Sequence, residues 1–276
     1  MSKKRTFRLF EDGEQTSKEL LYEEVRNEQG QLRSYVNYES PETIEGHYEY
    51  NDKGQVVLEK EIIDGAEASK VAYEYDDKGN LIHTKQYVAD EIFEEVIHEY
   101  REGGVTMRKV RFGEEIERQV EVKEGHQSTK EVYEEEALTE RQQAEYNPET
   151  RTYHIQVEDA EGHHLTNRIR TEDEAGNLLL KEERNLKGQV LTSSQRTYEN
   201  GKVTYEKHED YLQGFHYEIH NEYDEAGRQV STETRSLSGH IIEFEKLEYD
   251  DQGRVTATRG ASRMGENFVL VHEYED

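Results

Sequence analysis

One short phrase returns along this chain at a nearly constant interval, and that interval limits which folds the chain can adopt. The phrase reads "YEYNDKGQVV" from Tyr48, "YEYDDKGNLI" from Tyr73, "NEYDEAGRQV" from Asn221 and "LEYDDQGRVT" from Leu247. The Glu-Tyr pairs that mark it end at Tyr50, Tyr75, Tyr100, Tyr146, Tyr223, Tyr249 and Tyr274, at intervals of 25, 25, 46, 77, 26 and 25 residues. These intervals are close to multiples of one period of about 25 residues, which predicts a repeat architecture.

The polar part of the phrase has the composition of a tight turn. An Asp or Asn at the first corner, such as Asn51, can accept hydrogen bonds from backbone N–H groups ahead of it. A Gly three residues later, such as Gly54, accepts the left-handed conformation that closes a hairpin with a bulge. A second glycine series lies half a period away and includes Gly162, Gly188, Gly214, Gly239 and Gly265. Each repeat is therefore predicted to hold two strands and two turns.

The segments between the turns have the alternation of β-strands. They are rich in β-branched and aromatic residues, as in "KVTYEKHEDY", which favours strands. Successive strand side chains point to opposite faces, so Tyr48 and Tyr50 would share one face and Glu49 the other. Tyr73 and Tyr75 repeat this arrangement. We expect one face of Tyr, Val, Leu and Ile and an opposite face of Glu, Lys, Arg and Thr.

The predicted fold is therefore all-β, with about ten hairpin repeats in a single domain over residues 1–276. The alternation favours antiparallel pairing in one long, twisted sheet. We expect an open spiral, a partial barrel or a single layer, with exposed edges protected by Glu and Lys.

The composition supports a thin sheet better than a thick core. Charged residues make up 36% of the 276 residues and hydrophobic residues 32%, and 35 basic against 63 acidic residues give a net charge of −28. Such values are also typical of disordered chains, but the 19 tyrosines and the regular turn signals oppose that interpretation. The acidity argues against nucleic acid and anionic membranes as partners, and it would attract a basic protein.

Other sequence signals concern the cellular compartment. The chain has no cysteine, so disulfides are impossible and the redox compartment stays open. The basic start "MSKKRTFRLFEDGEQ" lacks the apolar run of a secretory signal. No stretch approaches membrane-spanning length, so we expect no membrane insertion and a cytoplasmic location.

Two segments also fit short helices. Residues 134–145 ("EEEALTERQQAE") contain helix-favouring side chains, although their register with the period favours a degenerate strand pair. Residues 11–30 offer a similar ambiguity. Two repeats depart from the phrase, because Pro148 starts a turn without the glycine device and Glu172 occupies the tyrosine position.

The four phrases resemble the tyrosine–aspartate (YD) repeats of the Rhs and teneurin-like proteins, and looser traces run from about Gly30 to the C-terminus. The resemblance implies a long spiralling β-sheet, which in bacterial members forms a hollow shell around a toxic cargo. The period here is longer than the family's, the chain is short for such a shell, and no Asp-Pro block precedes a toxin domain. The resemblance therefore bears on fold more than on function.

No catalytic set emerges from the sequence. His216, Glu218 and His220 would share one strand face at a spacing that could hold zinc, but the repeat already predicts a solvated polar face there. His163 and His164 fall at a turn. The acidic "NDKG" and "DDKG" turns lack the ligand spacing of calcium loops, and no phosphate loop or nucleophile triad is present. We therefore expect no enzyme, no cofactor and no metal site.

The tyrosine face is the sequence's main candidate for binding. Its predicted members are Tyr48, Tyr50, Tyr73, Tyr75, Tyr100, Tyr223 and Tyr249, although the pattern favours a structural use of these rings, which would cover their own neighbours or a concave interior. We expect a non-enzymatic bacterial scaffold that binds or neutralises a basic protein such as a toxin or effector. The alternative is a carbohydrate-binding or adhesin-type surface module that uses the tyrosine-rich face. The sequence leaves the oligomeric state open.

Overall fold

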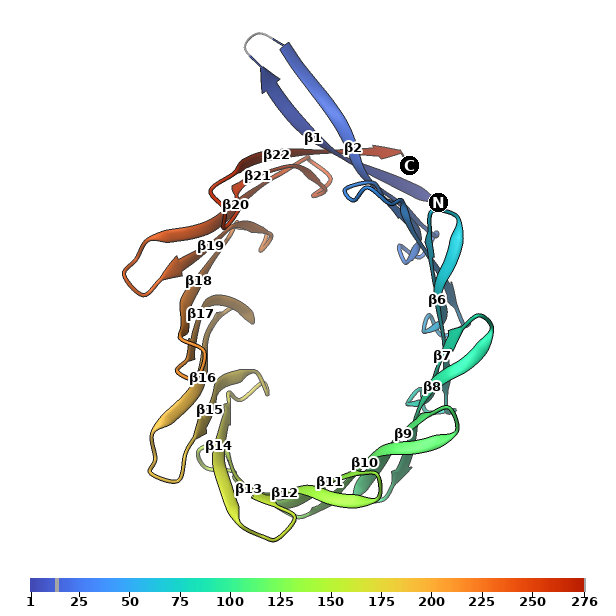
Figure 1. Ribbon diagram of the computed structural model, residues 1–276. Helices are drawn as coiled ribbons and strands as arrows, with labels where there is room; N and C mark the ends of the chain where they lie inside the picture. Colours follow the sequence, from blue (N-terminus) through green and yellow to red (C-terminus); the bar gives the residue numbers. More distant parts are fainter. Residues whose placement is uncertain (13–14, 276) are drawn as a thin grey trace. The chain divides into compact units, whose positions relative to one another are not determined.

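The computed structural model describes residues 1–12 and 15–275, and all regular structure in those ranges is β-strand (Figure 1). The predicted all-β class is confirmed. The first strands are β1 (Ser2–Asp12), β2 (Gln15–Arg26), β3 (Leu32–Asn37), β4 (Ile44–Tyr50), β5 (Val56–Ile63), β6 (Ala66–Tyr75), β7 (Leu81–Val88) and β8 (Glu91–Arg101). Next come β9 (Gly104–Arg111), β10 (Glu114–Glu124), β11 (Gln127–Glu134), β12 (Ala137–Asn147), β13 (Thr152–Asp159), β14 (His164–Glu172) and β15 (Leu178–Arg184). The last are β16 (Val190–Glu199), β17 (Lys202–Asp210), β18 (Phe215–Tyr223), β19 (Gln229–Ser236), β20 (Ile241–Tyr249), β21 (Val255–Ala261) and β22 (Asn267–Glu275).

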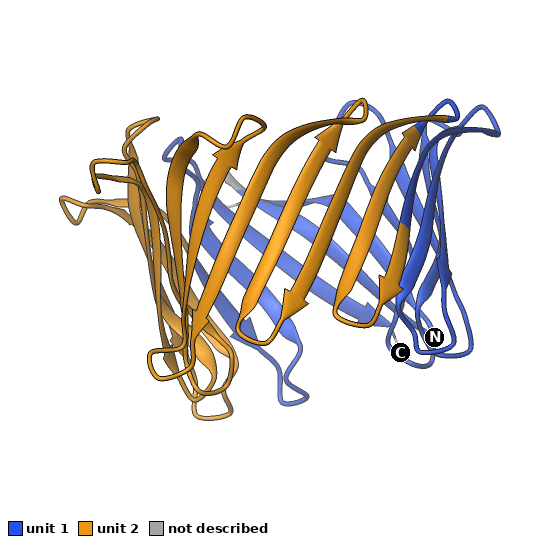
Figure 2. Cartoon of the chain, turned by 90° about the horizontal axis from the view of Figure 1, so that it is seen from below, with its two compact units in different colours: residues 1–97, 111–113, 245–276 blue, residues 98–110, 114–244 orange. Residues whose placement is uncertain are grey.

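The chain forms two compact units, coloured separately in Figure 2. Unit 1 holds Met1–Ile97, Arg111–Gly113 and Glu245–Asp276, and unit 2 holds His98–Val110 and Glu114–Phe244. Within unit 1, consecutive strands from β1 to β7 pair antiparallel. Within unit 2, consecutive strands from β10 to β19 do the same. The antiparallel hairpin repeat predicted from the sequence is therefore present in each unit.

The turn after β4 shows why the phrase has its polar residues. Asn51 accepts backbone N–H bonds from Lys53 and Gln55 at 3.0 Å each through its Oδ1. Gly54 has a φ of 78°, where a side chain would be strained. The pairing register shifts between Glu49 and the next residue, as expected for a bulge. The predicted turn device is confirmed.

The second tyrosine of the phrase ties one turn to the next. Tyr75, just before its own turn, donates its hydroxyl proton to the carbonyl of Val56, just after the preceding turn, at 2.9 Å. The same bond joins Tyr50 to Leu32, Tyr198 to Leu178, Tyr223 to Val203 and Tyr274 to Val255 at 2.5–3.1 Å. In unit 1 the turns are also linked directly, because Gln55 donates to the carbonyl of Gly79 at 2.9 Å. The phrase thus encodes both a turn and its attachment to a neighbour.

Both helical alternatives are wrong where the structure describes them. Residues 134–145 form the end of β11, a tight turn and most of β12. Residues 11–12 and 15–26 belong to β1 and β2, residues 27–30 belong to a turn, and residues 13–14 lie outside the described ranges. Pairing with neighbouring strands overrides the helix propensity of Glu, Leu and Gln in these segments.

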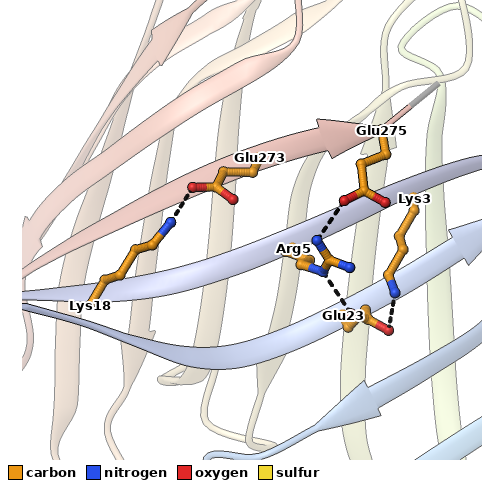
Figure 3. A network of polar contacts seen from close by, with 6 residues as sticks. All are labelled: Lys3, Arg5, Lys18, Glu23, Glu273 and Glu275. Atoms are coloured by element: carbon orange, nitrogen blue, oxygen red, sulfur yellow. Dashed lines mark hydrogen bonds and ion pairs between the residues drawn. The ribbon is translucent and has the colours of Figure 1, made fainter.

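The first and last strands of the chain lie side by side in unit 1. Residues 3–8 of β1 pair antiparallel with residues 270–275 of β22, and β1 also pairs with β2. Figure 3 shows ion pairs around this terminal pairing: Arg5 contacts Glu275 of β22 at 2.5 Å and Glu23 of β2 at 2.9 Å, and Lys18 of β2 contacts Glu273 of β22. The expectation of exposed edges is therefore wrong for the two terminal strands, because each has a partner on both sides.

The buried interior is small, as the composition predicts. Among the described residues, the buried apolar side chains are Leu21, Val157 and Ala257, with 2–7% of their surface exposed. Hydrogen bonds, ring contacts and ion pairs between neighbouring strands therefore carry much of the stability.

Candidate binding surface

Four tyrosines and two glutamates gather on one face of unit 1, over β2 to β6. We call this set the Tyr–Glu surface: Tyr22, Tyr35, Tyr48, Tyr73, Glu59 and Glu61. The pairing register brings them together, since Tyr48 lies opposite Glu59, and Gly46 lies opposite both Tyr35 and Glu61. Side chains of directly opposed residues share a face. The predicted separation of tyrosines from glutamates onto opposite faces is therefore wrong here.

The rings of Tyr22, Tyr35 and Tyr48 form a row across three neighbouring strands. The first two are stacked, with centroids 5.6 Å apart and an interplanar angle of 22°, and the next pair is tilted at 6.4 Å. Gly46 makes room for this row, because a Cβ atom there would lie 2.0 Å from Cε1 of Tyr35. The glycine therefore lets the Tyr35 ring lie flat against the backbone of β4.

The glutamates set the electrostatics of the surface. Tyr73 donates its hydroxyl proton to Oε2 of Glu59 at 3.1 Å. Burial, reinforced by this carboxylate, raises the pKa of Tyr73 to about 12 and that of Tyr48 well above its usual range. The pKa of Tyr35 is also raised, mainly by burial and to a lesser extent by the charges of Glu61 and Glu59. The hydroxyls therefore stay protonated and act as donors.

A cation beside the Tyr–Glu surface, Arg26, acts on Tyr22 but is already paired with Glu24 at 2.9 Å. Elsewhere the chain places a Lys or Arg over a tyrosine, as with Lys70 over Tyr87 at 4.8 Å and Arg118 over Tyr133 at 4.6 Å. Within the described ranges, no such cation lies over the four rings of the Tyr–Glu surface. No ion pair of the described residues neutralises Glu59 or Glu61. Aromatic faces beside free carboxylates are favourable for a cation supplied from outside.

An acidic hollow adjoins this surface in unit 1. It has a volume of about 440 Å³ and lies between the turns at residues 51–55 and 76–80. Its lining includes Tyr73, Asp52, Asp76 and Asp77. Hydrogen bonds from Asn80 hold the pKa of Asp76 below its usual range, so this carboxylate stays charged.

The tyrosines predicted from the sequence have different roles in the structure. Tyr48 and Tyr73 belong to the Tyr–Glu surface. The hydroxyls of Tyr50, Tyr75 and Tyr223 bind backbone carbonyls, so these three rings brace the turns.

The remaining two predicted tyrosines lie outside the Tyr–Glu surface. Tyr100 is 48% exposed at the end of β8 and stacks on His98 at 6.2 Å, and Tyr249 ends β20. Sequence reasoning missed Tyr22, Tyr35, Glu59 and Glu61. The 13-residue spacing of Tyr22, Tyr35 and Tyr48, half the period, was the available signal.

The three candidates for a zinc site share one face of β18, as the alternation predicts. Glu218 accepts the hydroxyl proton of Tyr205 at 2.9 Å and lies 3.6 Å from His220. Among the described residues, the three ligand-type side chains that come within 4.8 Å of one another are Asp159, Glu161 and His163. The carboxylate of Asp159 is already engaged within its own turn, because it accepts the backbone N–H of His163 at 2.7 Å and contacts the imidazole at 2.9 Å. This contact raises the pKa of His163.

Comparison with known proteins gives structural likenesses only. No family model matches the chain, and no curated protein matches it. The Tc holotoxin pore of Photorhabdus luminescens shows 12% identity and a TM-score of 0.30, and the match covers 90% of this chain but 19% of that one. The TcdB2–TccC3–Cdc42 structure shows 11% identity and a TM-score of 0.31, and the match covers 96% of this chain and 19% of that one. A porin-like protein from Bacteroides uniformis shows 11% identity and a TM-score of 0.34, and the match covers 99% of this chain and 97% of that one.

The chain thus spans about a fifth of the toxin chains that it matches. Likenesses at these scores do not bear on its activity or its partners. The described residues contain no helix that is both long and apolar enough to cross a membrane.

Proposed function

We propose that this chain is a non-enzymatic β-repeat protein that binds a basic partner protein through the Tyr–Glu surface. The observation that carries the proposal is the pairing of four tyrosine rings with Glu59 and Glu61. Among the described residues, no cation lies over these rings and no ion pair holds these two carboxylates. A Lys or Arg of the partner would lie over a ring and contact a carboxylate, as Arg118 and Lys70 do within the chain. The net charge of −28 would speed association with such a partner.

An octalysine peptide provides a direct test of the surface. We expect the peptide to bind more weakly as salt rises, since exposed charges are screened. The double variant Glu59→Gln/Glu61→Gln should weaken binding by about tenfold, the loss of roughly 1–2 kcal/mol of charge and cation–π interaction. The control is Glu225→Gln, which removes one acidic charge at an exposed turn in unit 2. An equal loss in this control would show that the peptide senses only overall acidity and would contradict the proposal.

A biological partner requires a search in the source organism. Affinity capture on the intact protein at low and high salt should retain a basic protein only at low salt. Its retention should also fall in the Tyr35→Ala variant. A capture that yields the same proteins with that variant would reject the Tyr–Glu surface as the contact.

Carbohydrate binding is the second candidate, and the stacked rings of Tyr22 and Tyr35 favour it because flat aromatic faces can pack against sugar rings. A glycan array distinguishes the two proposals, since sugar binding would be independent of salt and lost in Tyr48→Ala. No signal on such an array would exclude this candidate.

We further propose that the first and last strands of the chain, β1 and β22, stay paired in solution within unit 1. The support is the terminal pairing of β1 with β22 in unit 1. Arg8 and Leu270 are opposite one another in that pairing, so the double variant Arg8→Cys/Leu270→Cys should form an intramolecular disulfide. Because it would close a loop of about 260 residues, loop entropy predicts a gain in stability of roughly 5–6 kcal/mol. Failure to oxidise would contradict this pairing.

A further inference from the structure

One edge of the unit 2 sheet carries exposed apolar side chains on three successive turns. Because consecutive strands are antiparallel, the turns β15–β16, β17–β18 and β19–β20 lie at the same edge. We call this the apolar edge. Its large side chains are Leu186, Tyr211, Leu212, Phe215, Leu237 and Ile241, which are 50–68% exposed. For a chain that is only 32% hydrophobic, this concentration is unusual and marks an interaction surface.

The opposite edge of the same strands is polar, although two of its turns share their backbone pattern with the two outer turns of the apolar edge. The turns at residues 173–177, 199–201 and 224–228 form this polar edge, and they carry no large exposed apolar side chain. The backbone pattern is shared: the N–H of Gly188 bonds the carbonyl of Asn185 at 2.9 Å, and that of Gly227 bonds Asp224 at 2.8 Å.

The residue after the first corner of each turn differs between the two edges. It is Glu174 or Glu225 at the polar edge, but Leu186 or Leu237 at the apolar edge. The turn itself therefore does not require leucine. The leucines must be explained by what covers the apolar edge.

The apolar edge also carries few charged side chains. Residues 185–189, 211–214 and 237–240 contain one charged side chain, Lys187, apart from the histidine His240. Asp210, which precedes the central turn, accepts the backbone N–H groups of Leu212 and Gln213 at 2.9 Å each. In a chain of net charge −28, this is a region where two acidic molecules can approach each other without facing a row of carboxylates.

We propose that the apolar edge is the contact surface for a second copy of this chain. Its chemistry is nearly symmetric about the central turn, which carries Tyr211, Leu212 and Phe215, while each outer turn carries a leucine. A two-fold axis through the central turn places Leu186 of one copy against Leu237 of the other and aromatic rings against aromatic rings. Such isologous contacts are the commonest in protein dimers. Lys187 of one copy then meets Ser236 and Ser238 of the other, with no like charge opposite.

The area of the apolar edge fits a weak dimer. Six large side chains that are 50–68% exposed offer about 600 Å² per copy, given roughly 150–250 Å² for a whole aromatic side chain. A pair would bury about 1,200 Å², which is the lower end of specific interfaces. Interface cores of this kind are poor in charge and rich in aromatic residues.

The dimer should strengthen with salt, because screening reduces the repulsion between two molecules of net charge −28. Binding of a basic partner to the Tyr–Glu surface should weaken with salt, so the two proposals can fail separately. The dimer does not rest on the proposed function.

The experiment is sedimentation velocity of the intact chain over a concentration series at about 0.05 M and about 0.5 M salt. We expect a monomer–dimer equilibrium of micromolar affinity that shifts toward dimer at the higher salt. The Leu212→Ser/Phe215→Ser variant should raise the dissociation constant by about tenfold or more. Met264→Ser, at an 89% exposed methionine in a turn of unit 1, is the matched control and should leave it unchanged.

A cysteine cross-link provides a second measurement that does not depend on whether the serine variant folds. The chain has no cysteine, so Leu212→Cys should give a disulfide-linked dimer under mild oxidation. Ala226→Cys, in the central turn of the polar edge, should not. A monomer under all conditions, or equal cross-linking of the two cysteine variants, would overturn the proposal. Flotation of the protein with phosphatidylcholine vesicles that is lost in Leu212→Ser/Phe215→Ser would overturn it in favour of a lipid surface.

Discussion

The two tyrosines of the repeated phrase have different physical roles. The hydroxyl of the second one, such as Tyr75, donates a hydrogen bond to a backbone carbonyl. The hydroxyl of the first one, such as Tyr73, donates to a glutamate side chain. One position therefore braces the sheet, and the other shapes a surface. The phrase alone does not separate these roles, because both positions are the same residue type on the same strand face.

Tyr75→Phe should reveal the bracing role. The change leaves the ring but removes the donor to Val56, a bond of 2.9 Å, so the free energy of unfolding should fall by about 1 kcal/mol. Urea denaturation followed by circular dichroism measures this change. Tyr38→Phe is the matched control, because Tyr38 is 41% exposed and its hydroxyl makes no hydrogen bond within the described residues. Equal losses in both variants would contradict the assignment.

Gly46→Ala should disturb the aromatic row of the Tyr–Glu surface. The added Cβ would lie 2.0 Å from the Tyr35 ring, so the ring must move and the free energy of unfolding should fall by about 1–3 kcal/mol. Near-ultraviolet circular dichroism should report the altered tyrosine environment. Gly125→Ala is a useful comparison, because that glycine has open space around its Cβ position but a φ of 61°. It should therefore lose stability without changing the tyrosine signal.

At the scale of the element, the hairpins were predictable and the strand faces were not. The spacing of Gly54, Gly79 and Gly227 located turns correctly, since a left-handed glycine in a tight turn is a local requirement. Which residues meet across two strands depends on the register, and many of the hairpins hold a bulge that shifts it, as at Glu74 and Tyr75. The corresponding shift between Glu49 and Tyr50 puts Glu59 opposite Tyr48, a pairing that alternation along one strand cannot reveal.

Asn51→Ala tests the turn as an element. The variant loses the two backbone bonds to Oδ1 and a side-chain bond to Gln55 at 3.0 Å. Unfolding free energy should fall by about 1–2 kcal/mol, as for other side chains that cap free backbone groups. The neighbouring variant Asp52→Ala lies in the same turn but removes no such bond within the described structure, and it should stay within about 0.5 kcal/mol of the parent. A similar loss in both would place the stabilisation elsewhere.

At the scale of the whole chain, the terminal pairing contains a half-buried histidine. His272 of β22 contacts Thr6 of β1 at 2.9 Å and Thr258 of β21 at 3.2 Å. Burial, with a smaller contribution from the nearby Lys4 and partly offset by Glu24, lowers the pKa of His272 to about 4. The imidazole is therefore neutral in the folded protein at neutral pH.

The terminal pairing should consequently be sensitive to acid. Between pH values of about 6.5 and 4 the unfolded chain binds a proton at His272 and the folded chain does not, so stability is complete above this window and falls as the pH is lowered through it. The loss should reach up to about 3 kcal/mol. Urea midpoints at the two ends of the window, compared between the parent and His272→Gln, measure it. His47→Gln, at an exposed strand position, is the control. A variant as acid-sensitive as the parent would contradict the assignment.

The contact between β1 and β22 also affects the order of folding. Hairpins between consecutive strands require only short loops to close, whereas this contact joins Lys3 to Glu275 across almost the entire chain, so it should form late. Because the two termini lie on neighbouring strands, a circular permutant could link them and begin instead within the 76–80 turn. In such a permutant β22 and β1 would become a local hairpin, and the slow, late step would move to β6 and β7.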